Sequence, residues 1–521
     1  ATATDPALTN PVQVAWADMS VPGSPSGMVS SSPRRVFYGS VGWIMIAKFD
    51  GGPKGLFSEY AVAAIEGQAL PGGLTLDTIW QSYDGNDEHV IVEAAVTSET
   101  DGFSAIVMDG DVLIAEGDAV LATGAAPGTV WLQHRAGIDL SQDNRLLLGA
   151  EIDDPTVTAP KETALLLYDV LPDGSLDNGE VILKTGDVFG GRVVKFVAGV
   201  TTATFERNEG GQIMHTLGFY DDDGVSSGNF AIVLDGVILA EDETTSVIPG
   251  RDWIVSVANS LDIAANGSWA FLSGIDGGGV GSSLLTLVHD GQLVALQGLS
   301  APGLPGTSVT HIGPPKLADD GRMLWYAKWT ENGSEREGLF VDDQLLVQEN
   351  VTMVDDTVLT AISLGFADYD IHPDSSRLMF TGSHNQLTSY GAYEVPLAPW
   401  RNLGHSLLGS HVGFPYLRAS GSLQAGSNTT IWLTRALPAS TTFLVFGFSE
   451  LGAPFKGGVL CPSPDIVFPG SPVDAFGTAS VSASFPSGVP SGTDLFWQWW
   501  TVDGAAAAGF SASNCVVGTT P

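Results

Sequence analysis

The chain has 521 residues, of which 64 are glycine and 29 are proline, and only 15% are charged. This composition is typical of short elements joined by tight turns, so it predicts an all-β fold rather than a protein of long helices. A formal net charge of −38 repels phosphate backbones and anionic headgroups, which excludes nucleic acid as a partner. No apolar run reaches the roughly 18 residues of a membrane span, so we expect no membrane insertion.

The first segment of the chain predicts an exported protein. Small residues at positions 1–4, ATAT, are typical of a mature protein after removal of a signal peptide, so we expect a secreted protein, extracellular or at the cell surface. Residues 12–23, VQVAWADMSVPG, read as a strand followed by a Pro-Gly stop. This segment resembles the end of a repeat rather than its beginning.

From position 35 onward one short unit recurs, and residues 109–128, DGDVLIAEGDAVLATGAAPG, give its pattern. Asp109-Gly110 predicts a tight turn, residues 111–116 predict a strand, and Gly117-Asp118 ends it. The aligned end positions are Gly67, Gly117, Gly186, Asp242, Gly298 and Asn350, at spacings of 50 to 69 residues. A period near this size is that of a propeller blade.

A second element, a polar turn followed by a compact apolar strand, precedes each of these ends. Its seven copies begin at positions 34, 88, 144, 212, 268, 322 and 377 and read RRVFYGSV, EHVIVEAA, NRLLLGAE, QIMHTLGF, SWAFLSGI, RMLWYAKW and RLMFTGSH. With a third strand between the two elements and an apolar segment ahead, each unit has four short antiparallel strands. Such sheets bury both faces by stacking around an axis.

Seven second strands but only six closing strands follow in order, and the N-terminal strand supplies the missing one. We therefore predict that residues 1–398 form a seven-bladed β-propeller in which residues 12–23 complete the last blade. Residues 399–521 carry a net charge of −1 and contain alternating runs bounded by Pro, Gly and Ser, which predict a C-terminal β-sandwich. The two cysteines, Cys461 and Cys515, would pair in an exported protein.

One acidic segment is a candidate calcium loop. Residues 169–180, DVLPDGSLDNGE, place Asp169, Asp173, Asp177 and Glu180 at positions one, five, nine and twelve, with glycine at six. The segment lacks an oxygen ligand at position three and lies between strands, so an acidic hairpin loop without a metal is the alternative. Calcium is the one cofactor that the sequence suggests.

The strand 494–502, DLFWQWWTV, carries the candidate interface or ligand platform. Trp497 and Trp499 would lie on one face of the strand, and Trp500 on the other. One face must be core. The other could pack against another subunit or stack on a sugar ring.

The repeated strand with its GD and PG punctuation, together with APFKGGVLCPSPD at 453–465 and the end GFSASNCVVGTTP, resembles uncharacterised secreted bacterial repeat proteins with a β-propeller and a C-terminal β-sandwich. The resemblance implies this fold and supplies no catalytic residues. The repeats lack the WD, kelch and YVTN signatures of other propellers.

Three functions follow as hypotheses. The first is a non-enzymatic extracellular structural protein that self-associates with other copies into a filament, sheath or surface layer, supported by the near-neutral, aromatic tail. The second is an adhesion module that binds a glycan or a cell-surface protein. The third is a propeller hydrolase or lyase with a site in the central channel, lined by converging His, Arg and carboxylate groups. The sequence favours the non-enzymatic function and leaves the other two open.

Overall fold

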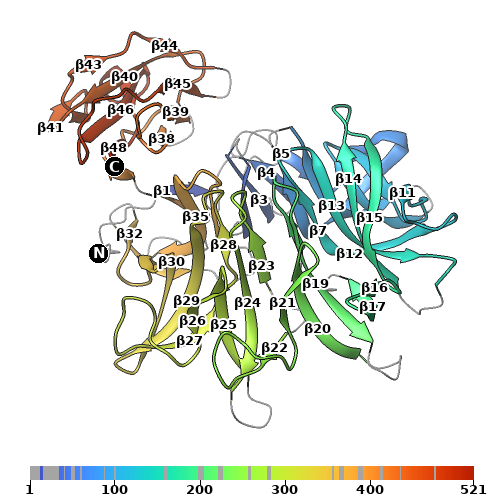
Figure 1. Ribbon diagram of the computed structural model, residues 1–521. Helices are drawn as coiled ribbons and strands as arrows, with labels where there is room; N and C mark the ends of the chain where they lie inside the picture. The colour runs from blue at the N-terminus through green and yellow to red at the C-terminus, as the bar shows by residue number, and fades with distance from the viewer. Residues whose placement is uncertain are drawn as a thin grey trace. The chain divides into compact units, whose positions relative to one another are not determined.

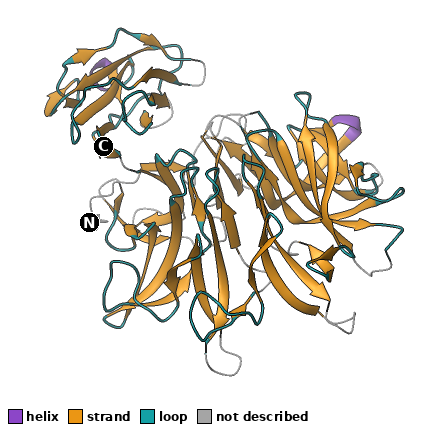
Figure 2. Cartoon of the chain, viewed as in Figure 1, coloured by secondary structure: helices purple, strands orange, loops and turns teal. Residues whose placement is uncertain are grey.

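The computed structural model is all-β (Figures 1 and 2). It describes residues 12–15, 34–39, 42–48, 53–58, 62–86, 88–98, 101–157, 162–197, 205–220, 227–255, 260–277, 283–354, 357–362, 369–384, 391–397, 399–410, 415–434, 436–474 and 477–521. Within these ranges the helical elements are two 3-10 turns, η2 (Pro71–Gly73) and η3 (Ala507–Gly509). No described helix has the length and apolar character needed to cross a membrane.

The chain divides into two compact units. The first contains residues 1–4, 16–349 and 361–373, and the second contains residues 5–15, 350–360 and 374–521. The domain boundary predicted at residue 398 therefore falls inside the second unit, which includes the last repeat as well as the tail.

The first unit contains six sheets that follow one another along the chain (Figure 1). The first sheet has β2 (Arg34–Gly39), β3 (Gly42–Lys48), β4 (Lys54–Ser58) and β5 (Val62–Ile65). The second has β6 (Ala69–Leu70), β7 (Leu74–Gly85), β8 (Val90–Thr97), β9 (Gly102–Met108) and β10 (Asp111–Ala115). The third has β11 (Ala122–Thr123), β12 (Val130–Leu140), β13 (Arg145–Asp153), β14 (Glu162–Val170) and β15 (Leu176–Lys184).

The other three sheets repeat the same order of strands. The fourth has β16 (Val188–Phe189), β17 (Arg192–Val197), β18 (Phe205–Arg207), β19 (Ile213–Tyr220), β20 (Ser227–Leu234) and β21 (Val237–Glu241). The fifth has β22 (Trp253–Ile254), β23 (Ser260–Ile263), β24 (Trp269–Asp276), β25 (Ser283–His289) and β26 (Gln292–Leu296). The sixth has β27 (Ser308–Ile312), β28 (Lys316–Leu317), β29 (Met323–Glu331), β30 (Ser334–Val341) and β31 (Gln344–Gln348).

In the first unit, one strand of each sheet lies beside the corresponding strand of a neighbouring sheet, and we call these strands the inner strands. β7 contacts β12, and the series continues through β18, β23, β28 and β34 (Tyr369–Ile371), which in turn contacts β2. Strands that are far apart in the sequence, β34 and β2, therefore meet. Apolar clusters fill the space between consecutive sheets, as where Ile106 and Ile114 of the second sheet pack with Leu148 of the third.

The structure corrects one element of the predicted repeat. The segment that begins at Arg34 was predicted to be a second strand, but it is β2, at the end of the first sheet, and β3 takes the second position. The reason is burial: Ile44, Met45 and Ile46 of β3 are 4%, 0% and 7% exposed, as a central strand requires.

Aspartates in the hairpin turns explain the recurring DG-type pattern. In four sheets the turn between the last two strands places an aspartate at positive φ, namely Asp109, Asp235, Asp290 and Asp342. Each Oδ1 accepts a 2.9 Å hydrogen bond from the amide that begins a central strand of its sheet, at Val90 of β8, Ile213 of β19, Trp269 of β24 and Met323 of β29. The aspartate amide donates to the carbonyl of the same residue. The turn thereby fixes three strands at once.

Replacing Asp290 with alanine should lower the free energy of unfolding by about 1–3 kcal/mol, because the bond to Trp269 is lost and alanine resists a left-handed φ. Asp290→Asn retains an oxygen acceptor and tolerates this φ, so it should retain most of the stability. Urea unfolding midpoints of the two variants measure the difference. Equal losses of stability in Asp290→Ala and Asp290→Asn would show that the side-chain oxygen at this position does not stabilise the turn.

A second glycine-type turn ends each repeat. Gly67, Gly117, Gly186 and Gly298 have φ between 87° and 91°, and their amides donate to the backbone of the strand that follows the turn. In the fourth repeat this role falls to Glu243, with φ of 62° and a bond to Trp253, and not to Asp242 as predicted. The alignment was wrong by one residue because that repeat has no glycine at the turn.

The second unit contains a sheet built from both ends of the predicted propeller segment. Its strand order is β1 (Val12–Ala15), β36 (Gly391–Pro396), β35 (Arg377–His384), β33 (Thr357–Ile362) and β32 (Met353–Val354). Val12 lies opposite Glu394 and Gln13 opposite Tyr393, so the N-terminal strand pairs with β36. Residues 16–23 of the predicted strand segment lie outside the described residues.

The tail forms three further sheets in the second unit. The largest has β37 (Trp400–Gly404), β40 (Thr441–Gly447), β43 (Ile466–Val467), β44 (Ser471–Pro472), β46 (Asp494–Val502), β47 (Phe510–Ala512) and β48 (Cys515–Thr519). A second has β38 (Tyr416–Ser420), β39 (Asn428–Thr434) and β45 (Ala479–Ser484), and a third has β41 (Glu450–Phe455) and β42 (Gly458–Pro462). Leu417 and Ile431 of the second share one core with Leu444 and Trp499 of the first.

The predicted disulfide is present and joins Cys461 to Cys515. It ties β42 to β48, with both cysteines fully buried beside Phe496. A hydrogen bond of 2.9 Å from Tyr416 Oη to Glu394 Oε1 links the tail to β36. The disulfide therefore joins two strands within the tail, and a buried hydrogen bond joins the tail to the preceding sheet.

Candidate functional site

The inner strands β7, β12, β18, β23, β28 and β34 carry a charged residue at the same place. In each strand it is the next-to-last residue, and the set consists of Asp84, Asp139, Glu206, Asp262, Lys316 and Asp370. Five of them have register partners at the beginning of the adjacent strand, at Ile91, Leu147, Met214, Ala270 and Leu324. Since the inner strands contact one another, these side chains form one cluster, which we call the inner cluster.

Three aspartates of the inner cluster connect consecutive sheets. Asp84 Oδ2 accepts a 2.7 Å bond from the amide of Leu140, and Asp262 Oδ2 accepts a 2.9 Å bond from the amide of Leu317. Asp139 accepts the corresponding bond from the amide of Arg207. In every case the donor directly follows the inner-cluster residue of the next sheet. These carboxylates thus have a structural role, whatever else they do.

Glu206 differs from these aspartates. The described residues provide no hydrogen bond to its carboxyl group, and the residue is half-buried rather than fully buried. Burial raises the pKa of Glu206 well above its ordinary value, and the charge of Asp139 raises it further. This carboxyl therefore holds a proton at a higher pH than a free glutamate and keeps part of its surface open.

The neighbouring acids are shifted in the same direction. Burial raises the pKa of Asp84 to about 6, against the bonds from Leu140 and Gly85. Burial, and then the charge of Asp84, raises the pKa of Asp139 well above its ordinary value. Burial also raises the pKa of Asp262, but the charge of Lys316 opposes that rise.

Lys316 is the one lysine or arginine among the six inner-cluster residues. Burial alone would lower the pKa of its ammonium group, but the charges of Asp262, Glu206 and Asp370 raise it above the ordinary value. The lysine therefore stays charged and favours the ionised form of Asp262. The cluster thus combines Glu206, whose pKa is raised well above its ordinary value, with Asp262, whose rise in pKa is opposed by a cation, and such unequal carboxyl groups suit general acid–base chemistry.

The raised pKa values predict how stability depends on pH. A carboxyl with a raised pKa in the folded state stabilises the fold below its unfolded pKa, and this contribution is lost as pH rises through the folded pKa. For Asp84 the window runs from 3.8 to about 6. We expect the free energy of unfolding to fall by about 1–2 kcal/mol between pH 4 and pH 7 from this residue, measured by urea unfolding at each pH.

Asp84→Asn should flatten this dependence, because the amide cannot ionise. Asp154 is the contrasting group: burial opposes ionisation, but its bond from Lys184 lowers its pKa below 3.8, so its contribution is lost only at lower pH. A pH profile of the Asp84→Asn variant identical to that of the wild type would rule out the assignment.

The four residues predicted to bind calcium lie on the β14–β15 hairpin, and two of them, Asp169 and Asp173, already have protein partners. Asp169 forms an ion pair with Arg145 at 2.7 Å and accepts a bond from Asn178. Asp173 accepts bonds from the amide and hydroxyl of Ser175. Asp177 lies opposite Asp169 in the ladder, and Glu180 is exposed farther along β15. Calcium binding here stays a prediction.

Within the described part of the chain, the one group of three potential metal ligands whose donor atoms lie within 4.8 Å of one another is His405, Glu450 and Cys461. Cys461 is in the disulfide, so it offers no thiolate to a metal. This group does not fit a metal centre.

The tryptophans of β46 are more buried than predicted. Trp499 and Trp500, on opposite faces of the strand, are 0% and 2% exposed, so the expectation of one free face is wrong for these two residues. The strand lies in the middle of its sheet and both faces are covered. Trp497 is half-buried and packs against Phe446 with ring centroids 4.3 Å apart. An interface or ligand role stays a prediction for Trp497 alone.

Sequence reasoning did not find the inner cluster, although the signal was present. The five members that have a register partner lie seven or eight residues before it in the recurring apolar strand, as Asp139 does before Leu147. A single acid at a constant distance from a repeated strand is inconspicuous in one repeat. It becomes informative only when the repeats are superimposed.

Comparisons with known proteins identify no family: no family description and no curated protein matches the chain. Among solved structures, the Dos1 propeller has 10% identity and a TM-score of 0.34, covering 74% of this chain and 96% of its own. An α-L-arabinanase from Penicillium chrysogenum, complexed with arabinobiose, has 12% identity and a TM-score of 0.26, covering 76% and 99%. The polysaccharide lyase Uly1 has 11% identity and a TM-score of 0.23, covering 78% and 92%. Similarities this low define no function.

Proposed function

We propose that the seven sheets form a seven-bladed β-propeller closed by the N-terminal strand, and that residues 399–521 form a β-sandwich. The series of contacts among the inner strands, which returns from β34 to β2, supports a closed ring. The pairing of β1 with β36 supports closure by the N-terminal strand. The core shared by two sheets of the tail supports the sandwich. The disulfide supports an extracellular location, where such bonds persist.

In this architecture the protein is best explained as an extracellular enzyme that cleaves glycosidic bonds by general acid–base catalysis, a hydrolase or a lyase. The observation that carries the proposal is the half-buried Glu206, a carboxyl with a raised pKa next to a carboxylate–lysine pair. Two carboxyl groups with unlike pKa values are the common equipment for glycoside cleavage.

The roles follow from the environments of the groups. Glu206 would donate its proton to the leaving oxygen, since it holds that proton and has no hydrogen bond among the described residues. Asp262, favoured as a carboxylate by Lys316, would accept a proton from water in hydrolysis or from a ring carbon in elimination. Asp84 and Asp139 would keep neighbouring sheets in register through Leu140 and Arg207.

Incubation of the purified protein with a panel of neutral and uronate-containing polysaccharides tests the proposal. New reducing ends without new ultraviolet absorbance indicate hydrolysis, and new reducing ends with the absorbance of an unsaturated uronate indicate elimination. Absence of both from the whole panel, under conditions where the protein is folded, would count against an enzyme.

Self-association is the second candidate function, and the tail provides its support. Phe448, Leu451 and Val467 are 58%, 49% and 52% exposed, at or beside β40, β41 and β43. Large exposed apolar side chains of this kind are typical of surfaces that pack against another protein. Other copies of this chain are one proposed partner, and a glycan or cell-surface protein is the other. Light scattering over a concentration series separates a monomer from an assembly.

A further inference from the structure

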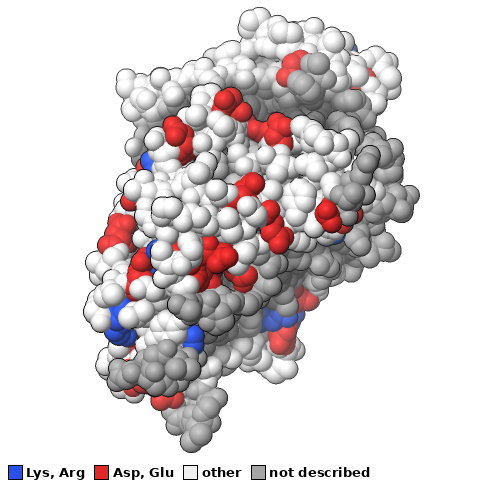
Figure 3. Space-filling view, turned by 90° about the vertical axis from the view of Figure 1, so that its right-hand side faces the viewer, with Lys and Arg blue, Asp and Glu red and all other residues white. Residues whose placement is uncertain are grey.

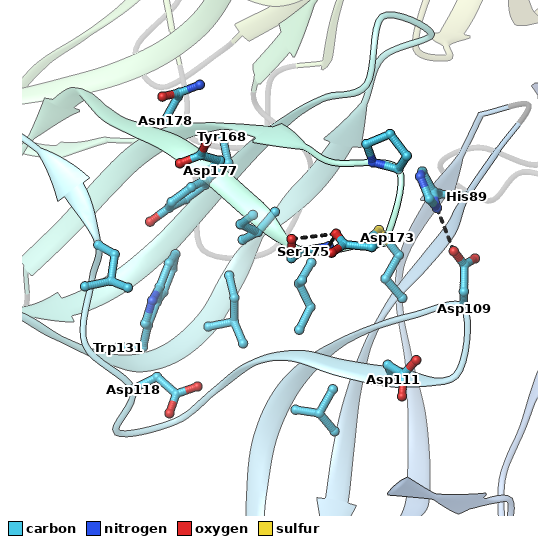
Figure 4. Close-up of a pocket in the computed structure, with 18 of the residues that line it drawn as sticks. His89, Asp109, Asp111, Asp118, Trp131, Tyr168, Asp173, Ser175, Asp177 and Asn178 are labelled. Atoms are coloured by element: carbon cyan, nitrogen blue, oxygen red, sulfur yellow. Dashed lines mark hydrogen bonds and ion pairs between the residues drawn. The ribbon is translucent and has the colours of Figure 1, made fainter.

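A groove lies between the second and third sheets of the first unit, away from the inner cluster (Figure 4). Its volume is about 780 Å³, which is within the usual range for binding sites of small ligands. One wall is β10, which contributes Asp111, Val112, Leu113 and Ile114, and the other is the β14–β15 hairpin. The proposed catalytic chemistry does not use this groove.

The groove is negatively charged. Five aspartates line it, namely Asp109, Asp111, Asp118, Asp173 and Asp177, and no lysine or arginine is among its lining residues. All five are exposed, and Figure 4 shows Asp111 and Asp118 on the side of β10 and Asp173 and Asp177 on the side of the hairpin. Figure 3 shows several clusters of acidic residues and few basic ones on the face that it presents. The groove therefore attracts cations.

Two of these carboxylates have no partner among the described residues. Asp109 binds His89 and Asp173 binds Ser175, whereas neither Asp111 nor Asp177 has a hydrogen bond or ion pair within the part of the chain that the structure describes. Asp111 begins β10 and Asp177 lies near the beginning of β15, so the two come from opposite walls. A ligand in the groove would have a free carboxylate on either side.

A histidine in the wall supplies a second, independent feature. His89 is 7% exposed, and its Nδ1 lies 2.6 Å from Asp109 Oδ2 (Figure 4). A carboxylate partner places the proton on Nδ1, which leaves Nε2 as an acceptor. That Nε2 is buried and has no hydrogen-bond partner among the described residues.

The shape of the β10 wall indicates the form of the ligand. β10 is the last strand of its sheet and pairs only with β9 among the described strands. Four of its five residues line the groove, with Ile114 buried and Leu113 half-buried. An unpaired strand edge is a template for another extended chain, because it presents backbone donors and acceptors in a row.

We propose that this groove binds an extended basic peptide segment, which adds to the edge of β10 and places lysine or arginine side chains against Asp111 and Asp177. Backbone pairing with β10 would supply affinity, and the aspartates on the two walls would select positive charge. A partner with such a segment would be a basic extracellular protein. The proposal does not depend on the proposed enzymatic function.

The test uses the full chain and a fluorescent, end-blocked peptide of alternating valine and lysine. We expect saturable binding that weakens about tenfold in the Asp111→Asn/Asp177→Asn double variant. The control, Glu209→Gln/Asp343→Asn, removes the same charge from exposed residues outside the groove and should change the affinity less than about twofold. Thermal unfolding of both variants verifies that they remain folded.

Two further ligands decide the mode of binding. The same peptide with alternate backbone amides methylated retains its charge but cannot pair fully with a strand, so its affinity should fall about tenfold. Spermine offers charge without a peptide backbone and should bind more weakly than the peptide. No binding of the peptide, equal loss in the two double variants, or equal affinity for spermine and the peptide would each overturn the proposal.

Discussion

Replacing Glu206 with glutamine should lower kcat/KM for a cleaved polysaccharide by roughly 10²- to 10⁴-fold, the usual contribution of a general acid. Glutamine has nearly the same volume and is also uncharged, so it resembles the protonated glutamic acid that burial favours. The fold should therefore tolerate the change. What is lost is the transferable proton, and the substrate affinity should change much less than kcat.

Glu209→Gln is the matched control, since this residue is exposed and only three positions away. It should leave kcat/KM within about twofold of the wild type. The pH profile gives a second readout: the limb that reports loss of the proton donor at high pH should disappear in Glu206→Gln. If the variant retains wild-type activity and profile, Glu206 is not the acid. If Glu206→Gln retains activity only toward substrates whose leaving group needs no proton, the role of Glu206 as a proton donor is supported.

The all-β fold was predictable because the residues that form its turns are adjacent in the sequence. A turn such as Asp109-Gly110 needs positive φ at both positions, and few residue pairs satisfy it, so the dipeptide marks a hairpin wherever it recurs. The same holds for Gly117 at the end of a repeat. The disulfide was predictable for a different reason, since a chain with two cysteines allows only one internal pair.

The candidate site was not predictable in the same way, because its residues meet only through tertiary structure. Asp139 and Asp262 stand alone in their strands, and nothing local distinguishes them from surface acids. Arg34 at the beginning of β2 and Gly42 at the beginning of β3 show the converse, where two adjacent apolar runs have the same pattern and only burial decides which is central. Trp500 was misjudged for the same reason, since a strand with two apolar faces does not reveal whether both are covered.

Lys316→Met should lower the free energy of unfolding by about 2–4 kcal/mol at neutral pH, because it removes the cation that Asp262, Glu206, Asp370 and Asp84 share. Because the lysine is half-buried, we expect a smaller loss of stability than for a fully buried ion-pair partner. Methionine fills a similar space, which makes the missing charge the main change. Lys316→Arg retains the charge and should recover much of the stability, and the exposed Lys456→Met should cost less than about 0.5 kcal/mol.

The effect of Lys316→Met should also depend on pH, with a definite sign. The ammonium group lowers the pKa of Asp262, Glu206 and Asp84, so its removal raises all three further. Carboxyls with raised folded-state pKa values stabilise the fold at low pH and lose that contribution as pH rises. The variant should therefore be close to the wild type near pH 4 and fall behind it progressively toward pH 8, measured by urea unfolding across that range. A deficit that is constant with pH would assign the loss to packing, and Lys316 would then have no electrostatic part in holding Asp262 ionised.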